Sequence, residues 1–444
     1  MVRRMATFEK AMEIARAGLA AVEGGRLVRA ILTRSGKDLE VLGKRFDLSR
    51  FKRTFLIAAG KAAGPMAAGF MAVLGDRVDG GIVTCRPGEN PDPDRLTAIP
   101  AAHPLPDAAS VRAGREAVCL AGQAGKNDAV FLLLSGGASA NLCLPAPGIS
   151  LKDKQFVTDC LLKAGANIRE LNAVRKHLSS VKGGLLAKAA WPARVISLVI
   201  SDVIQNDLGV IASGPAHPDS STFGDAENIL RKFGLWEAVP ASVQNRLVAG
   251  GRGEVEETLK EGDRTLGRIS TFVIGDIGTA LRAARARAQE LGFSALILTE
   301  SDSGEAGTAA KNYVAFLEGL SCSRKNSGAP LCFLAGGEVT VTVKGKGLGG
   351  RNTEFVLAAL TAMPRSARGW LVLSLGTDGR DGPTDAAGAW ADPSLWTVAR
   401  AKGLDPQSFL ADNDSNSFFK RTGRLILTGP TGTNVMDLRI FILN

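Results

Sequence analysis

The feature that most constrains the fold is an apolar run without polar alternation, Val130 to Leu134, which ends in Ser135-Gly136-Gly137. A second such run spans residues 194–200 and ends in Ser201-Asp202. A strand with one face in water alternates apolar and polar residues, whereas a strand covered on both faces, as in parallel sheets, does not. We therefore predict an α/β fold with largely parallel, Rossmann-like sheets that carry helices on both faces.

The segment after the first run favours anion binding. Ser135, Gly136, Gly137 and Ser139 place two hydroxyls and two residues without side chains at the carboxyl end of the predicted strand. Bare backbone N–H groups at such a position can surround a phosphate. The alternative is a tight turn that requires glycine only for its backbone angles.

Lys61 is the first candidate catalytic residue. It follows a short predicted strand, residues 53–59, and precedes a helix of small residues. A cation at a helix N-terminus is unfavourable by about 0.3–1 kcal/mol unless a bound anion reverses the local field. We predict that Lys61 binds an anion; the alternative is a side chain that extends into water. The chain around it matches neither G-x-x-x-x-G-K-[ST] nor G-x-G-x-x-G, the two standard nucleotide-binding motifs.

Polar residues between positions 172 and 184 form a second candidate region. Asn172 and Arg175 are followed by Lys176, His177, Lys182 and a glycine pair. We predict contact with a substrate carboxylate or phosphate; a charged helix face is the alternative. Carboxylates follow further along the chain: Asp202 is a candidate general base or Mg²⁺ ligand, and Asp207 a weaker candidate ligand.

The length of 444 residues predicts two domains. A charged, glycine-rich stretch at residues 248–268 indicates the boundary, which gives domains at residues 1–250 and 265–444. The expected strands after the boundary are residues 270–274, 294–298, 331–334, 339–343 and 370–375.

Polar residues in the second half also follow the expected strands. Arg351 lies among glycines in GKGLGGRNTEF, where a guanidinium can approach phosphate closely. Glu338 follows a glycine pair, and Asp378 lies in the acidic turn GTDGRDGPTDAAG. Both are candidate metal ligands, and a glycine-rich turn without a ligand is the alternative.

Composition and charge exclude several classes. The net charge of +10 favours anionic partners, but no Lys/Arg run interleaved with aromatic residues indicates nucleic-acid binding. Six cysteines without a C-x-x-C pair, and only three histidines, favour reduced thiols over a zinc site. No apolar run approaches ~20 residues, and the start has no signal-peptide pattern. We expect a cytoplasmic protein without nucleic-acid or membrane partners; a homodimer is left open.

Six segments carry a family resemblance: LLLSGGASANLCLPAPG, GANIRELNAVRKHLSSVKGGLLA, SDVIQNDLGVIASGPAHPD, LGGRNTEFVLAAL, GTDGRDGPTDAAGAWAD and GPTGTNVMDL. They resemble the glycerate 2-kinase family, or class II glycerate kinases, whose C-terminal half contains the MOFRL region, here about residues 331–440. The resemblance implies phosphorylation of D-glycerate at its 2-hydroxyl, with ATP and Mg²⁺, in a cleft between two α/β domains. The lysine and arginine emphasised in the family match Lys61 and Arg351.

Two segments depart from the family's pattern. The family's cradle usually reads SGGGSALL, whereas this chain has Ala138 and Asn141. Where the family tends to show SDVPGDDPS, this chain reads SDVIQNDLG, with Ile204, Gln205 and Asn206 in place of Pro, Gly and Asp. That loop therefore has one carboxylate fewer.

Two other function classes remain as alternatives. Some members of the family are labelled hydroxypyruvate reductase, but this chain has no G-x-G-x-x-G followed by an acidic residue ~20 positions on, as NAD(P)H binding would favour. A non-enzymatic anion-binding protein is disfavoured because cations and carboxylates occur together at strand ends in both halves.

Overall fold

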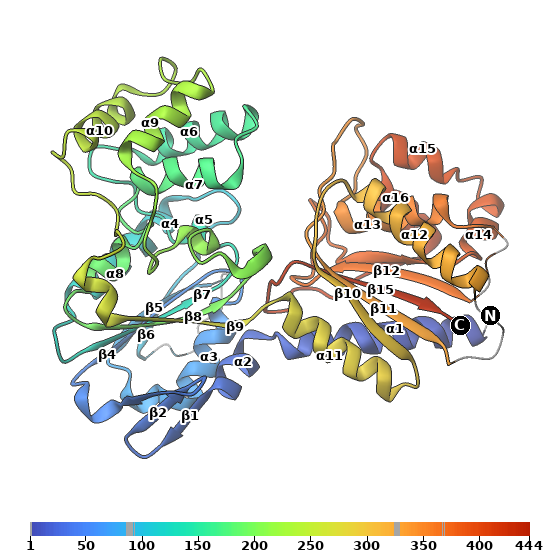
Figure 1. Cartoon of the computed structure of the whole chain (residues 1–444), viewed down its shortest axis with the longest axis horizontal. Coiled ribbons are helices and arrows are strands. Elements are labelled where there is room, and N and C mark those ends of the chain that lie inside the picture. Colours follow the sequence, from blue (N-terminus) through green and yellow to red (C-terminus); the bar gives the residue numbers. More distant parts are fainter. Residues whose placement is uncertain (1, 86–91, 93, 324–328, 366, 368) are drawn as a thin grey trace. The chain divides into compact units, whose positions relative to one another are not determined.

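The computed structural model describes residues 2–85, 92, 94–323, 329–365, 367 and 369–444. The chain divides into two compact units: one is Gly24–Ile274, and the other combines Met1–Glu23 with Gly275–Asn444 (Figure 1). We call the first the inserted unit and the second the outer unit, because the first interrupts the sequence of the second. The unit boundaries therefore differ from the expected domains in two places, the first 23 residues and the region near residue 274.

The inserted unit contains the predicted parallel sheet. Its strand order is β6-β5-β4-β7-β8-β9, and every pair from β6 to β8 is parallel. In that order the strands are Leu96–Ile99, Gly80–Thr84, Thr54–Ala59, Ala129–Leu134, Arg194–Ile200 and Ile269–Gly275. The two continuous apolar runs are β7 and β8, and they are buried in the middle of the sheet.

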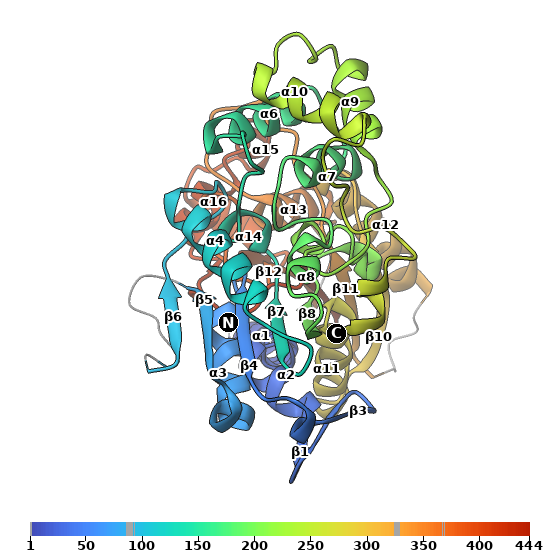
Figure 2. The same ribbon diagram turned by 90° about the vertical axis from the view of Figure 1, so that its left-hand side faces the viewer.

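Two strands of this sheet correct the sequence interpretation. The proline-rich sequence of residues 86–106 indicates a loop, but Leu96–Ile99 forms β6 by pairing with β5 at the edge of the sheet (Figure 2); residues 86–91 and 93 lie outside the described residues. The run at 270–274 was expected to open the second domain, but as β9 it joins the inserted unit's sheet. The two errors have different causes: the prolines around residues 96–99 concealed a short edge strand, whereas the pattern at 270–274 indicated a strand without indicating its neighbours.

Helices cover both faces of this sheet. α2 (Gly24–Ile31) packs on α3 (Ala63–Leu74), which contacts β7 through Phe70 and Phe131, with ring centroids 4.7 Å apart. On the opposite face, α4 (Ala108–Gly122) and α8 (Leu185–Ala189) bury alanines and leucine against alternate strand residues. A small antiparallel sheet, β1 to β3, completes this end of the unit: Leu32–Ser35, Asp38–Val41 and Lys44–Asp47.

A helical group with its own apolar core forms the rest of the inserted unit (Figure 1). It consists of α6 (Leu151–Lys163), α7 (Ile168–His177), α9 (Phe223–Lys232) and α10 (Ala241–Gly251). The sequence of residues 152–171 indicates one helix, but the structure has two, α6 and α7, because Gly165 adopts a φ of +80° and Asn167 caps α7.

The outer unit contains a mixed sheet, so the prediction of largely parallel sheets is wrong here. The order is β10-β11-β15-β12-β13-β14, and only β10 and β11 are parallel among the described pairs. In that order the strands are Ser294–Asp302, Leu331–Gly337, Asp437–Leu443, Trp370–Gly376, Gly388–Ala391 and Leu425–Ile426. The chain's last strand, β15, inserts antiparallel between β11 and β12, which no local pattern could show. The strand expected at 339–343 is absent from the described elements, where Thr340 forms only an isolated bridge to Glu305.

Helices also cover both faces of the outer unit's sheet (Figure 1). α1 (Val2–Ala21) and α11 (Ile277–Glu290) pack together on one face. On the other, a large apolar core lies beneath α12 (Ala306–Ser323), α13 (Arg351–Ala362), α14 (Leu395–Ala401), α15 (Pro406–Ala411) and α16 (Ser415–Thr422). None of the described helices is both long and apolar enough to cross a membrane.

Candidate active site

The two loops predicted to bind phosphate lie against each other at the carboxyl ends of β4 and β7. The Lys61 N–H donates to the Gly136 carbonyl (2.8 Å), and the Ala62 N–H donates to the Ser135 hydroxyl (3.0 Å). Gly60 has a φ of +118°, and a Cβ there would lie 2.2 Å from Ser135 Oγ. Only glycine permits this approach. The structure therefore brings Lys61 together with the predicted cradle.

The side chains of Lys61 and His103 both lie next to Gly137. It adopts a φ of +89°, and a Cβ there would lie 3.2 Å from Lys61 Cγ and 3.0 Å from His103 Cδ2. A larger residue at 137 would fill the space between the lysine and the imidazole. His103, which stands before Pro104 in a proline-rich sequence typical of a turn, therefore also borders the cradle.

Ser139 connects the cradle to α7. Its hydroxyl lies 2.9 Å from the hydroxyl of Ser213, which donates to Asn172 Oδ1 (3.0 Å). The Ser139 carbonyl accepts a hydrogen bond from Lys182 Nζ (2.8 Å) and a longer one from Arg175 Nη2 (3.5 Å). The residues predicted to bind phosphate and those predicted to bind substrate therefore share one polar network.

The two lysines of this network are removed from water, and Arg175 is half-buried. Lys182 is 1% exposed and Lys154 is 3% exposed. Burial lowers the pKa of Lys182 well below its usual range, lowers the pKa of Lys154 to about 7, and lowers the pKa of Arg175. No carboxylate of the described residues forms an ion pair with these three side chains. Sequence reasoning missed Lys154, because nothing in the helical segment LKDKQF marks that lysine as buried.

The two candidate carboxylates of the inserted unit lie in different surroundings. Asp202 follows β8, which pairs in parallel with β7, so it lies at the same sheet edge as the cradle. The Asp207 carboxylate accepts the Gly209 N–H (3.0 Å) and faces Arg169 (3.6 Å). Asp207 also lines a cavity of about 360 Å³ that includes Asn172.

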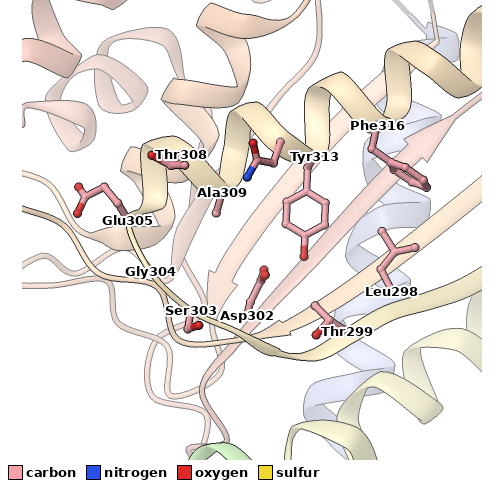
Figure 3. A pocket seen from close by; sticks show the side chains of 11 residues that line it. Leu298, Thr299, Asp302, Ser303, Gly304, Glu305, Thr308, Ala309, Tyr313 and Phe316 are labelled. Atoms are coloured by element: carbon pink, nitrogen blue, oxygen red, sulfur yellow. The ribbon is translucent and has the colours of Figure 1, made fainter.

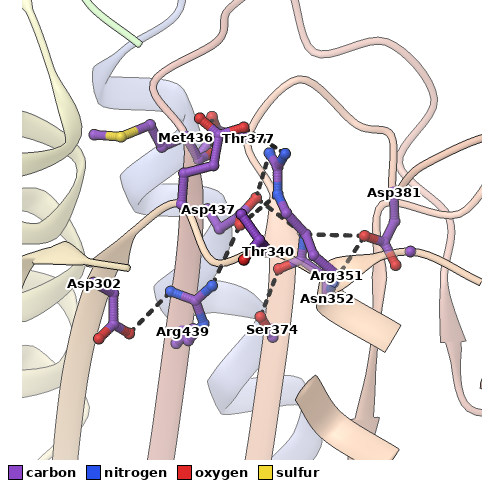
Figure 4. A network of polar contacts seen from close by, with 12 residues as sticks. Asp302, Thr340, Arg351, Asn352, Ser374, Thr377, Asp381, Met436, Asp437 and Arg439 are labelled. Carbon is purple, nitrogen blue, oxygen red and sulfur yellow. Dashed lines mark hydrogen bonds and ion pairs between the residues drawn. The ribbon is translucent and has the colours of Figure 1, made fainter. Parts of the chain in front are cut away.

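In the outer unit, Arg351 begins α13 inside a group of carboxylates (Figure 4). Its Nε and Nη2 donate to the Asp437 carboxylate (2.7 and 3.0 Å), and its Nη1 donates to Glu338 (2.5 Å). Asp437 is paired in register with Gly337 and Gly376, so β15 starts where β11 and β12 end. The start of β15 and the residue after β11 thus bring their carboxylates to one guanidinium.

The same network extends to a second buried arginine. Arg439 donates to Asp437 (3.3 Å) and to Asp302 (3.0 Å), while Asp381 accepts the backbone N–H groups of Asn352 and Thr353 (both 2.8 Å). Burial raises the pKa of Asp381. Burial alone would lower the pKa of Arg351, but Asp437 and Glu338 outweigh it, so this pKa lies above its usual range.

Sequence reasoning found Arg351 and Glu338 but not Asp437, although the segment GPTGTNVMDL that contains it was recognised. Asp378, the other metal candidate of the outer unit, accepts the Arg380 N–H (3.0 Å) in the loop after β12. Across the described residues, no three His, Cys, Asp or Glu side chains are gathered so as to hold a metal ion.

A separate cavity of about 490 Å³ lies between β10 and α12 in the outer unit (Figure 3). Tyr313 and Phe316 extend toward it from α12, and Leu298 and Thr299 border it from β10. Burial and the neighbouring Asp302 raise the pKa of the Tyr313 hydroxyl. The described lining holds two carboxylates and no Lys or Arg, so this cavity does not suit an anionic substrate.

Comparison with known proteins places the chain in a family. Residues 10–248 match the domain of unknown function DUF4147, and residues 331–437 match the MOFRL family. The chain is 40% identical to the glycerate 2-kinase of Pyrococcus horikoshii over 98% of both chains. The chain belongs to the glycerate 2-kinase family.

Other relatives in the glycerate 2-kinase family are similar over the same extent. The D-glycerate 2-kinase of Thermotoga maritima is 39% identical, over 98% of this chain and 97% of the relative. A crystal structure of glycerate kinase from Thermotoga maritima has a TM-score of 0.85 at 38% identity, covering 99% of this chain and 100% of that chain. Family membership and the α/β architecture, both expected from the sequence, are confirmed.

The departure from the family's pattern in SDVIQNDLG lies where the backbone has positive φ angles. Gln205 has a φ of +64° and Asn206 a φ of +56°. The family's glycine falls at position 205, where a residue with a Cβ costs about 1–2 kcal/mol in this conformation. The loop keeps its left-handed turn in this chain without the glycine that suits it.

Proposed function

We propose that this chain is a glycerate 2-kinase, which transfers the γ-phosphoryl group of ATP to the 2-hydroxyl of D-glycerate and releases ADP and 2-phospho-D-glycerate. Membership of a family whose relatives are named glycerate 2-kinase supports the reaction. The observation in this chain that carries the proposal is the hydrogen bond from the Lys61 N–H to the Gly136 carbonyl, which places Lys61 beside the left-handed Gly137 at the carboxyl edge of a parallel sheet.

Phosphoryl transfer requires the protein mainly to position the reactants and to neutralise charge. In the proposal, Gly136, Gly137 and Ser139 bind the phosphates of ATP, and Lys61 neutralises charge on the transferred group. Ser135 acts by holding the two loops together, since its hydroxyl already accepts the Ala62 N–H and its own N–H donates to Ala59.

Asn172 and Arg175 bind D-glycerate in this proposal, because the hydroxyls of Ser139 and Ser213 connect Asn172 to the cradle and the Ser139 carbonyl accepts from Arg175. Asp202 lies at the same sheet edge, where it would accept the proton of the attacking 2-hydroxyl or hold Mg²⁺. A single carboxylate suits Mg²⁺, which keeps several waters and takes further oxygens from substrate phosphates. When bound, Mg²⁺ would neutralise charge on those phosphate oxygens. Asp207, Glu338 and Asp378 stay weaker candidates.

Arg351 supplies a cation from the outer unit. Three of its five N–H groups are used by Asp437 and Glu338, so two remain for a phosphate or carboxylate oxygen. Because Lys61 and Arg351 belong to different units, we propose that closure of the two units around the substrates completes the site.

We also propose that the protein works in the cytoplasm, without membrane or nucleic-acid partners. The five cysteines that the structure describes are free thiols, which suits a reducing compartment. A homodimer stays a prediction, and light scattering of the purified chain measures it.

The direct test mixes purified protein with D-glycerate, ATP and Mg²⁺ and follows ADP release, with ³¹P NMR to locate the phosphate. We expect ADP and a phosphate on the 2-oxygen. ADP release with the phosphate on the 3-oxygen would correct the regiochemistry. No ADP, together with oxidation of NADH by hydroxypyruvate, would replace the kinase assignment by the reductase.

A further inference from the structure

Lys182, which is buried, and Arg175, which is half-buried, have more hydrogen-bond donors near Ser139 than the protein uses. The Lys182 ammonium has three N–H groups and donates one, to the Ser139 carbonyl. The Arg175 guanidinium has five and makes one long contact, 3.5 Å, to that same oxygen. Two cations thus converge on a single neutral carbonyl, and most of their donors have no acceptor among the described residues.

A buried cation whose N–H groups lack acceptors, such as Lys182, destabilises the folded protein. Burial of an ionised side chain without a charge partner disfavours the folded protein by several kcal/mol, so such groups are rare outside functional sites. Lys176, the next residue of α7 after Arg175, shows the usual arrangement. It is also buried, but its Nζ lies 3.1 Å from the Asp219 carboxylate. The cations at 175 and 182 differ from it in having no carboxylate.

The backbone around Lys182 is built to hold this position. Gly183 and Gly184 both adopt positive φ, and their N–H groups donate to the carbonyls of Ser213 and Gly214. A Cβ at Gly184 would lie 2.3 Å from Leu259 Cβ, so the turn can only pack this closely with glycine. The ammonium at 182 is therefore fixed beside Ser139.

Lys154 fixes the other cation. Its Nζ donates to the carbonyls of Arg175 (2.8 Å) and Leu178 (3.0 Å), which belong to the last turn of α7 and the residue after it. A cation at a helix C-terminus stabilises that end of the helix. Lys154 thus holds the backbone from which Arg175 extends and adds positive charge behind it.

We propose that Arg175 and Lys182 form the subsite for the carboxylate of the hydroxy-acid substrate, with Lys154 as the positioning residue behind them. The inference rests on the proposed function, because the substrate there is a small α-hydroxy acid. A carboxylate accepts up to about four hydrogen bonds and takes a bidentate guanidinium, which matches the unused donors. The Ser139–Ser213–Asn172 hydroxyl chain then lies between this subsite and the phosphate cradle.

The test compares Lys182→Met with Lys188→Met in the full chain. Lys188 lies six residues further along and has its own partner, Glu256, at 2.7 Å. For Lys182→Met we expect the KM for D-glycerate to rise at least about 30-fold, with the KM for ATP unchanged. Its preference for D-glycerate over the neutral D-glyceramide should largely disappear. Lys188→Met should behave as the parent chain.

Other outcomes overturn the inference. An unchanged KM for D-glycerate in Lys182→Met removes the residue from the subsite, and a raised KM for ATP instead makes the site a phosphate site. If Lys182→Met does not fold, Arg175→Lys provides the same comparison of D-glycerate with D-glyceramide. That variant keeps the positive charge but loses the planar guanidinium that binds a carboxylate with two hydrogen bonds.

A failure of the proposed function would be distinguishable. If the parent chain releases no ADP, calorimetric titration with D-glycerate still tests the subsite. Binding by the parent chain and its loss in Lys182→Met would support the carboxylate subsite without the kinase. Equal binding by both would exclude it.

Discussion

Arg351 and Arg439 in the outer unit are surrounded by carboxylates, whereas Lys154, Arg175 and Lys182 in the inserted unit have only backbone carbonyls as acceptors. A paired charge is stabilised before any ligand arrives and mainly fixes geometry. An unpaired one lowers the stability of the folded chain and gains most when an anion binds. In the proposed site, we therefore expect the outer unit to present a pre-oriented guanidinium, and the inserted unit to supply most of the affinity for the substrate's carboxylate.

The largest expected effect comes from breaking the paired network. Asp437→Ala removes the shared acceptor of Arg351, Arg439 and Asn352 at a fully buried position. We expect the free energy of unfolding of the outer unit to fall by about 3–5 kcal/mol, because the fully buried Arg439 keeps only Asp302 as a charge partner and Arg351 keeps only Glu338. Hydrogen exchange read on outer-unit peptides measures this.

The matched control for that prediction is Glu338→Ala. Its ion pair with Arg351 joins side chains that are 45% and 31% exposed, so we expect a loss of about 0–1 kcal/mol. If both variants lose the same stability, the paired network does not carry the stability assigned to it.

The next effect is on turnover and compares one cation from each unit. Lys61→Met and Arg351→Met should each lower kcat by about 10²–10³-fold, as expected when a donor to the developing charge is removed. Arg351→Met should also reduce the free energy of unfolding, because Asp437 loses its bidentate partner. Full turnover in either variant would exclude that residue from the mechanism.

A smaller effect is a pH dependence confined to the unpaired cations. Lys154 has a folded pKa of about 7 and a usual value of 10.5. The unfolded chain therefore binds more protons between these values, and the free energy of unfolding should increase as pH rises from about 7 toward 10. Arg351, whose pKa is raised, contributes no such increase.

Urea unfolding of the parent chain and of Lys154→Met at pH 7 and pH 9 measures this difference. The groups that influence Lys154 are the Cys143 thiol, Arg175 and Arg246, and none of them is a carboxylate. The parent chain should gain stability relative to Lys154→Met over this range. The same gain in both chains would assign it to other groups.

The smallest effect concerns the helix that presents Asn172 and Arg175. The Asn167 side chain accepts the N–H groups of Arg169 and Glu170 (both 3.0 Å) and caps α7. Asn167→Ala should reduce the free energy of unfolding by about 1 kcal/mol. A raised KM for D-glycerate would accompany this if the cap also orients Arg175, while a KM equal to that of the parent chain would restrict it to stability.

The sequence predicted what local chemistry determines. Continuous apolar runs predicted the strands β7 and β8. Glycines that follow strands predicted the loops that meet at Gly60 and Ser135. It could not predict pairing between distant segments, so β9 was assigned to the wrong unit and the antiparallel β15 was not foreseen. Burial of charge was equally hidden, because Lys154 and Lys176 look alike in sequence although only Lys176 has a carboxylate.

The discontinuous outer unit has a consequence for the order in which the protein can fold. α1 leaves the ribosome before α11, the helix against which it packs, and the whole of Gly24–Ile274 is made between them. At about 5–20 residues per second, that interval is on the order of ten seconds or more. During synthesis the inserted unit can fold by itself. The apolar side of α1 stays uncovered until α11 has been made, and we expect chaperones to bind it in that interval.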